Sequence, residues 1–258
     1  MALWTVAARA ETIVYLSRDG VDLRPGRNNS HAGTSSLIEE PATIGPWETT
    51  PEVWAETVAC VREVYAPFAV TITEEEPGNV PYIQAVFGGS PLDLDMPRSY
   101  AGISPFRGDC SVIERSIVFA FTDILPPDAQ TVCHTIAQEI GHSFGLDHVL
   151  MDSDPMSTAH KPGKRAFVDQ DAACGEGKPR KCGLPSSPCS TTQNSYALLA
   201  ERIGLAGDEL SLRAVDQQPD EVGCAAAGGS GGGALLVLAV VAPITRRPRA
   251  NRIPRKNP

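Results

Sequence analysis

The sequence lacks several features that would place it in a common class. Its seven cysteines include no Cys-x-x-Cys pair, so a zinc ribbon or a thioredoxin-type redox motif has no support. Its purely apolar run, residues 234–244, is too short by itself to cross a hydrocarbon core of about 30 Å. No internal repeat is visible. Apolar residues make up 42% and charged residues 21% of the chain, an ordinary globular composition that argues against wholesale disorder.

Acidic residues are absent from the C-terminal end of the chain. From Cys224 onward there is no Asp or Glu, but there are six Arg or Lys residues. The formal net charge of the whole chain is −9, so residues 1–223 carry a net charge of −15. A body this acidic is repelled by phosphate backbones, which predicts that the protein binds no nucleic acid.

The number of cysteines indicates an oxidising compartment. Seven are many for a cytosolic chain of this size, and disulfides form and persist mainly in exported proteins. Six of them precede the tail and can form up to three bridges, with fifteen possible full pairings. The seventh, Cys224, opens the tail. The six are at positions 60, 110, 133, 174, 182 and 189.

Hydrophobic periodicity predicts a mixed α+β domain. The run at 117–121 is apolar on both faces, as a central strand requires. The polar stretch at 17–48 is expected to be a loop, and residues 161–191 a loop cross-linked by cysteines. The expected strands are 12–16, 69–73, 82–87 and 113–121, with a short edge strand at 100–103, and the expected helices are 51–66, 128–144 and 193–203.

The helix expected at 128–144 has two different faces on a helical wheel. One face is apolar and carries Cys133, which predicts a disulfide there. Gln138 and His142 lie one turn apart on the opposite face, with Glu139 beside them. Gly145 permits a sharp turn in a left-handed conformation, and His148 follows three residues later. The apolar members are Val132, Ile136 and Ile140.

This order, Glu-x-x-His-x-x-Gly-x-x-His, resembles the metzincin zinc proteases, and the Gly-Leu-Asp-His after the turn looks like their matrixin branch. Met156, eight residues after His148, matches the family's Met-turn. The resemblance is specific over 132–157. It implies a twisted mixed sheet with a backing helix at 51–66, an active-site helix and a C-terminal helix. It also implies a peptide substrate lying along the edge strand near 100–104.

The resemblance further implies the roles of the site residues. Zinc would be held by His142, His148 and Gln138, and Glu139 would act as the general base in peptide-bond hydrolysis. The family has a histidine where this chain has Gln138. A neutral amide oxygen is a poorer zinc ligand than imidazole, so a catalytically inactive protein that binds a peptide or a protein partner is the alternative. His160 is a conceivable substitute ligand, whereas His134 lies too far along the helix from His142 to share an ion with it.

The two ends of the chain predict export. Residues 1–10 end in Ala-Arg-Ala and are interpreted as a remnant of a signal peptide. The order Cys224, glycine-rich stretch, apolar run and Arg-Arg resembles the C-terminal sorting tails of myxobacterial surface proteins. That resemblance implies processing near Cys224 and delivery to the cell surface, with the tail in the membrane beforehand. The expected layout is therefore a domain at 11–205, an acidic linker at 206–223 and a sorting tail at 224–258. The sequence gives no indication of the oligomeric state.

Overall fold

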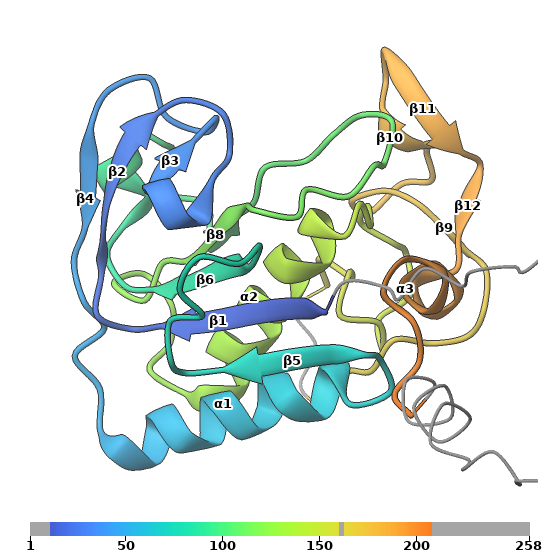
Figure 1. Ribbon diagram of the computed structural model, residues 1–258. Helices are drawn as coiled ribbons and strands as arrows, with labels where there is room; N and C mark the ends of the chain where they lie inside the picture. Colours follow the sequence, from blue (N-terminus) through green and yellow to red (C-terminus); the bar gives the residue numbers. More distant parts are fainter. Residues whose placement is uncertain (1–10, 160–162, 208–258) are drawn as a thin grey trace, which may run out of the picture. The chain divides into compact units, whose positions relative to one another are not determined.

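A five-stranded twisted sheet lies at the centre of the described part of the chain, residues 11–159 and 163–207, in this computed structural model (Figure 1). The strands follow the order β5-β1-β6-β8-β7. All neighbours are parallel except β7, which runs antiparallel to β8 and forms one edge. Their bounds are β1 Thr12–Ser17, β5 Val70–Thr73, β6 Ile83–Phe87, β7 Gly102–Ile103 and β8 Ile117–Ala120. The expected strands are confirmed, including the edge position of β7.

Two long helices pack against each other and against one face of this sheet. Helix α1, Pro51–Tyr65, begins after Thr50, whose side chain accepts a hydrogen bond from a first-turn amide. Helix α2, Ala129–Ser143, begins in the same way after Asp128. The two are joined by the disulfide Cys60–Cys133, and the buried Tyr65 hydroxyl donates to the carbonyl of Ala137 in α2 at 2.8 Å. The disulfide expected on the apolar side of α2 is therefore present.

The expectation of a loop over 17–48 is wrong. This segment contains a second sheet of order β3-β2-β4, which comprises β2 Val21–Pro25, β3 Thr34–Ser35 and β4 Ala42–Ile44, together with the short 3-10 helix Ser30–Ala32. Leu23 and Ile44 of this sheet pack with Phe119 of β8, on the face away from the helices. The segment covers the second face of the central sheet. That coverage is why β8 is apolar on both faces.

The C-terminal part adds strands that the sequence did not predict. Short strands β9 Ala172–Ala173, β10 Cys182–Leu184, β11 Ser187–Ser190 and β12 Thr192–Gln193 lie within or just after the segment expected to be a cross-linked loop. The cross-links themselves are present, as Cys174–Cys182 and Cys110–Cys189. Helix α3, Ser195–Ile203, then packs Leu199 and Ile203 into the core beside α1 and α2.

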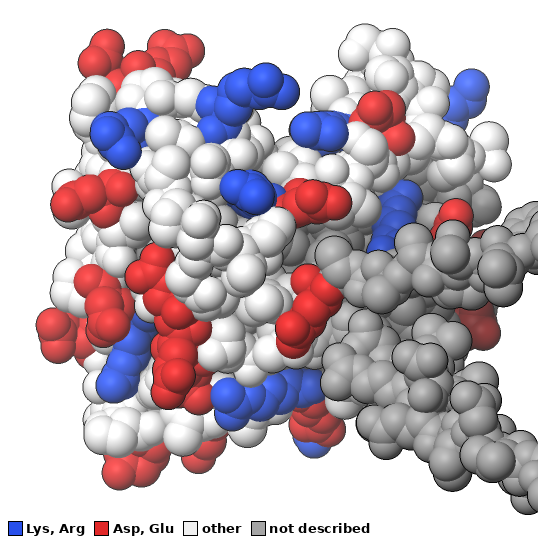
Figure 2. Space-filling view, in the orientation of Figure 1, with Lys and Arg blue, Asp and Glu red and all other residues white. Residues whose placement is uncertain are grey.

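Several expectations concern residues outside the described ranges. These are the signal-like segment 1–10, His160, nearly all of the linker 206–223, and the tail 224–258 with Cys224. Within the described ranges, no helix is both long and apolar enough to traverse a bilayer. Acidic and basic side chains are interspersed on the face seen in Figure 2 rather than sorted by sign.

The disulfide between α1 and α2 should contribute more to stability than the one closing the small loop. Cys60–Cys133 spans 73 residues and Cys174–Cys182 spans 8, and the entropy removed from the unfolded chain grows with loop length. We expect the double alanine variants to lose about 4 and about 2.5 kcal/mol, respectively. Urea unfolding of the three proteins measures both losses, and equal losses would contradict this ranking.

Candidate metal and active site

A cleft of about 1060 Å³ lies between the edge strand β7 and the exposed side of α2. It is lined by Gln138, Glu139 and His142 from the last turns of α2, and by His148 from the segment that follows. The structure therefore brings together the four side chains that the sequence predicted to form one site. They meet because the chain reverses at Gly145, whose φ of 80° lies in the left-handed region.

The turn at Gly145 fixes the His142 ring. His142 Nδ1 lies 2.7 Å from the carbonyl oxygen of Leu146, which can only accept a hydrogen bond. The proton of the neutral imidazole is therefore on Nδ1, and Nε2 presents a lone pair to the cleft. Burial, and then the neighbouring His148, lower the pKa of His142 to about 3, so the ring is neutral at physiological pH. Phe106 packs against its side, with the two ring centroids 5.7 Å apart.

His148 is oriented by a carboxylate that the sequence analysis did not identify. Its Nδ1 lies 2.8 Å from Oε1 of Glu176. Hydrogen bonds from Arg180 and His148 lower the pKa of Glu176 to about 2, so this carboxylate accepts the proton on Nδ1. In the neutral ring the Nε2 atom of His148 then carries the lone pair, as in His142. This carboxylate–histidine arrangement is the one that commonly orients metal-binding histidines.

The Nε2 atoms of His142 and His148 face each other at 3.0 Å. Because both Nδ1 atoms donate to acceptors, two neutral rings would direct two lone pairs at each other, and a proton on one Nε2 would make the contact a hydrogen bond. Two lone pairs at this distance repel unless a cation lies between them. The arrangement therefore fits a divalent metal ion that prefers imidazole ligands, and zinc is the commonest such ion.

Gln138 is held in one orientation beside the histidines. Its Nε2 donates to the carbonyl oxygens of Pro155 and Ser157, at 3.2 and 3.1 Å. With both amide protons occupied, the carbonyl oxygen Oε1 is the group left for the cleft, and it accepts no hydrogen bond from the described residues. Gln138 thus presents an oxygen donor on the same helix face as His142, one turn away.

Glu139 is buried against the edge strand. Burial raises the pKa of its carboxyl group to about 8, which is the range of a group that exchanges protons near neutral pH. A methyl group placed on Gly102 of β7 would lie 2.8 Å from Oε1 of Glu139 and 2.7 Å from the carbonyl oxygen of Phe119. Gly102 is therefore the residue that lets the strand approach the carboxyl group this closely.

Met156 packs against α2 at Gly141, the residue before His142. Its side chain is fully buried, and its sulfur would be only 2.4 Å from a methyl group on Gly141 of α2. The turn that carries it is fixed by Asp154, whose carboxylate accepts from the amide of Met156 at 2.8 Å. The backbone of Met156 also accepts from Val149, which anchors the segment just after His148.

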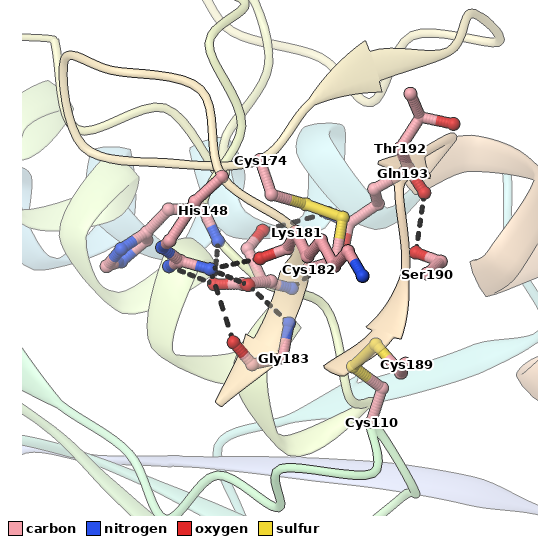
Figure 3. The surroundings of a disulfide bond; sticks show 12 residues. Cys110, His148, Cys174, Lys181, Cys182, Gly183, Cys189, Ser190, Thr192 and Gln193 are labelled. Atoms are coloured by element: carbon pink, nitrogen blue, oxygen red, sulfur yellow. Dashed lines mark hydrogen bonds and ion pairs between the residues drawn. A yellow bond between two sulfur atoms is a disulfide. The ribbon is translucent and has the colours of Figure 1, made fainter. Parts of the chain in front are cut away.

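The residues that the sequence analysis missed belong to one ionic network beside the disulfide Cys174–Cys182, which Figure 3 shows together with His148 and Gly183. Arg180 binds both Asp147 and Glu176, and Asp147 also accepts from the backbone amides of His148 and Gly183. Glu176 and Arg180 lie inside the small loop closed by Cys174–Cys182. The four-residue spacing of Glu176 and Arg180 is the only local signal for this pair, because the segment has no helical or strand periodicity.

Asp147, His148 and Glu176 could in principle form a metal site of their own, since their ligand atoms lie within 4.8 Å of one another. Both carboxylates, however, already pair with the guanidinium group of Arg180. Asp147 is also used by backbone amides, which together with Arg180 lower its pKa despite burial. We therefore assign this group to the orientation of His148 rather than to metal binding.

Comparisons with known proteins add little to this geometry. No known protein family matches the chain, and no curated protein matches it. Among solved structures, archaemetzincin from Methanopyrus kandleri is similar, with a TM-score of 0.33 and 11% identity over 60% of this chain and 86% of that chain. A likeness at this level assigns neither family nor activity, so the assignment rests on the site itself.

Removal of Glu176 should weaken metal binding without unfolding the protein. Glu176→Ala leaves Nδ1 of His148 without its acceptor, and loss of such a partner typically costs 10–100-fold in metal affinity. Competition with a zinc-chelating dye measures this affinity. Glu56→Ala, an exposed site on α1, serves as the matched control. Equal affinities of the two variants would show that Glu176 does not orient a ligand.

A methyl group on Gly141 should destabilise the protein through Met156. The gain in helix propensity from Gly to Ala is about 1 kcal/mol, but overpacking against the sulfur typically costs 1–3 kcal/mol. We expect a lower melting temperature for Gly141→Ala and little change for Gly45→Ala, where added atoms meet nothing within 4 Å. A melting temperature of Gly141→Ala at or above that of the parent would contradict this packing.

Proposed function

We propose that this protein is a zinc-dependent endopeptidase with a metzincin-like fold, in which His142, His148 and Gln138 hold the ion. The observation that carries the proposal is the convergence of the Nε2 atoms of His142 and His148 at 3.0 Å, while both Nδ1 atoms are held by hydrogen-bond acceptors. The amide oxygen of Gln138 and the carboxyl group of Glu139 lie in the same cleft. One carboxyl group next to a histidine-rich metal site is the arrangement that hydrolytic zinc enzymes use.

When bound, zinc would supply Lewis-acid polarisation of the scissile carbonyl and would lower the pKa of a water molecule. The residues of the chain would transfer the proton and orient the metal ligands. Glu139 is placed to take a proton from the attacking water and to pass it to the leaving amine. Its buried position raises its proton affinity, which suits both halves of that task. Leu146 and Glu176 hold the histidine tautomers that leave both Nε2 atoms available.

The walls of the cleft suit an extended peptide. Among the described residues, strand β7 pairs with β8 on one side only, so its other edge offers backbone groups to a further strand. Tyr100, Ile124 and Leu184 line the cleft and are all more than one-third exposed, although they are large and apolar. Such side chains around a polar centre are typical of ligand-binding clefts.

The site of action that we propose is outside the cytoplasm. Three disulfides among the described residues fit an oxidising compartment. The proposal of a surface-anchored protein also relies on the sorting-type tail 224–258, and that of a matrixin-like branch relies on the Gly-Leu-Asp-His sequence at 145–148.

Loss of Glu139 should abolish turnover but leave metal binding intact. Glu139→Gln removes the proton acceptor and not a ligand, so we expect a 10²–10⁴-fold loss of peptidase activity. Zinc content by elemental analysis should stay at one ion per chain. Retained turnover in this variant would remove Glu139 from the mechanism.

Gln138→His separates the enzyme from the second candidate, an inactive peptide-binding protein. An imidazole should bind zinc more tightly than the amide, so the variant is expected to retain the metal longer in the presence of a chelator. If the native protein cleaves peptides at saturating zinc, Gln138 is a working ligand. If only Gln138→His cleaves them, Gln138 disables the site, and the native protein is an inactive peptide-binding protein.

A further inference from the structure

The cleft extends beyond the metal-binding residues, along α2 towards its N-terminal end. On the helix it is lined by Thr131, His134 and Thr135, which lie one and two turns before Gln138. Its other wall there is the segment 157–159 together with Arg165. This part of the cleft is not needed to hold the ion or to supply the base. Its chemistry therefore bears on what is bound beside the reacting bond.

Arg165 is an immediate neighbour of the metal-binding residues. Its Nη1 donates to the carbonyl oxygen of Ser157 at 2.7 Å, and the same oxygen accepts from Nε2 of Gln138 at 3.1 Å. Its Nη2 donates to the carbonyl oxygen of Ala159. These contacts fix the guanidinium plane at the wall of the cleft. Each Nη atom retains a second N–H, since an arginine has five N–H bonds in a planar fork.

The positive charge of Arg165 is not matched by a contacting carboxylate among the described residues. The two oxygens that accept hydrogen bonds from Arg165 belong to neutral backbone carbonyls. Its Nε is buried and has no hydrogen-bond partner among the described residues. Asp152 and Asp154 attract it through space, but burial outweighs them and lowers the pKa of Arg165. The cation is therefore partly desolvated and incompletely compensated, which favours an added anion.

His134 does not provide a second permanent charge. Burial, and then the nearby Arg165, lower the pKa of His134 below its ordinary value. It is therefore mainly neutral at physiological pH and can offer a hydrogen bond. The hydroxyl group of Thr135 donates to Thr131 within the helix. The side chains of α2 and Arg165 therefore make this wall polar, with Arg165 as its fixed positive charge, whereas Ile124, Leu125 and Pro126 add apolar surface to the cleft just before α2.

We propose that this part of the cleft binds a carboxylate group of the peptide substrate through Arg165. The carboxylate is either the side chain of an Asp or Glu next to the scissile bond, or the C-terminal carboxylate of a short peptide. Arg165 is then a specificity-determining residue. This inference rests on the proposed function for its substrate, but the binding preference can be measured without turnover.

The test uses peptides that differ only in this group. One pair has blocked ends and Glu or Gln beside the scissile bond, and a third peptide has Gln and a free C-terminal carboxylate. Binding to the zinc-loaded full chain with Glu139→Gln is measured by fluorescence anisotropy, and cleavage by the chain with Glu139 is followed by mass spectrometry. We expect a carboxylate peptide to bind about tenfold more tightly than the neutral one. If the Glu peptide binds more tightly, the bound carboxylate is an acidic side chain. If the peptide with the free C-terminus binds more tightly, it is the C-terminal carboxylate.

Three variants connect the preference to Arg165. In Arg165→Gln the preference should fall to about one, whereas Arg165→Lys should retain much of it because the charge remains. Lys164→Gln is the matched control, since Lys164 is exposed, pairs with Glu63 and does not line the cleft. Zinc affinity is measured in each variant, because Arg165 shares the Ser157 carbonyl with Gln138.

The outcomes are distinguishable from failure of the proposed function. Equal binding of all three peptides, or a preference that survives in Arg165→Gln, would overturn the inference even if the protein is an active peptidase. A preference that Arg165→Gln abolishes, found in a chain that cleaves none of the peptides, would support the inference and count against the peptidase.

Discussion

The contact between Nε2 of His142 and Nε2 of His148 is the constraint on which the site depends. The lone pairs of two neutral rings repel each other at 3.0 Å, and the hydrogen bonds made by both Nδ1 atoms hold the rings in this orientation. The backbone turn at Gly145 provides one acceptor and Glu176 provides the other. A bound cation would convert this repulsion into attraction, so the folded chain is organised for a ligand that completes it.

The remainder of the fold supports this contact from two sides. Helix α2 is held by α1 through Cys60–Cys133 and Tyr65, which keeps its apolar face on the sheet and its polar face in the cleft. On the other side, Arg180, which lies in the disulfide-closed loop with Glu176, holds Glu176 and Asp147 together. Both sides rely on contacts between residues far apart in the sequence. The geometry of the site is therefore a property of the whole fold.

Local pattern was enough to predict the helices, the strands of the central sheet and four residues that line the cleft. Gln138, Glu139 and His142 lie on one helix, where a period of 3.6 residues determines which side chains share a face. His148 was predicted to join them because Gly145 permits a sharp turn just before it. The sheet formed by β2, β3 and β4 was missed, because its strands are short and lie among Gly, Asn and Ser residues that usually mark loops. Glu176 and Arg180 were missed because only tertiary folding brings them to His148.

The most direct test of the central claim is a crystal structure of the zinc-loaded protein with anomalous data at the zinc edge. The account predicts one strong peak in contact with Nε2 of both His142 and His148, with the Gln138 amide oxygen turned towards it. A peak at the carboxylates of Asp147 and Glu176 instead, or no peak at the two histidines, would contradict it.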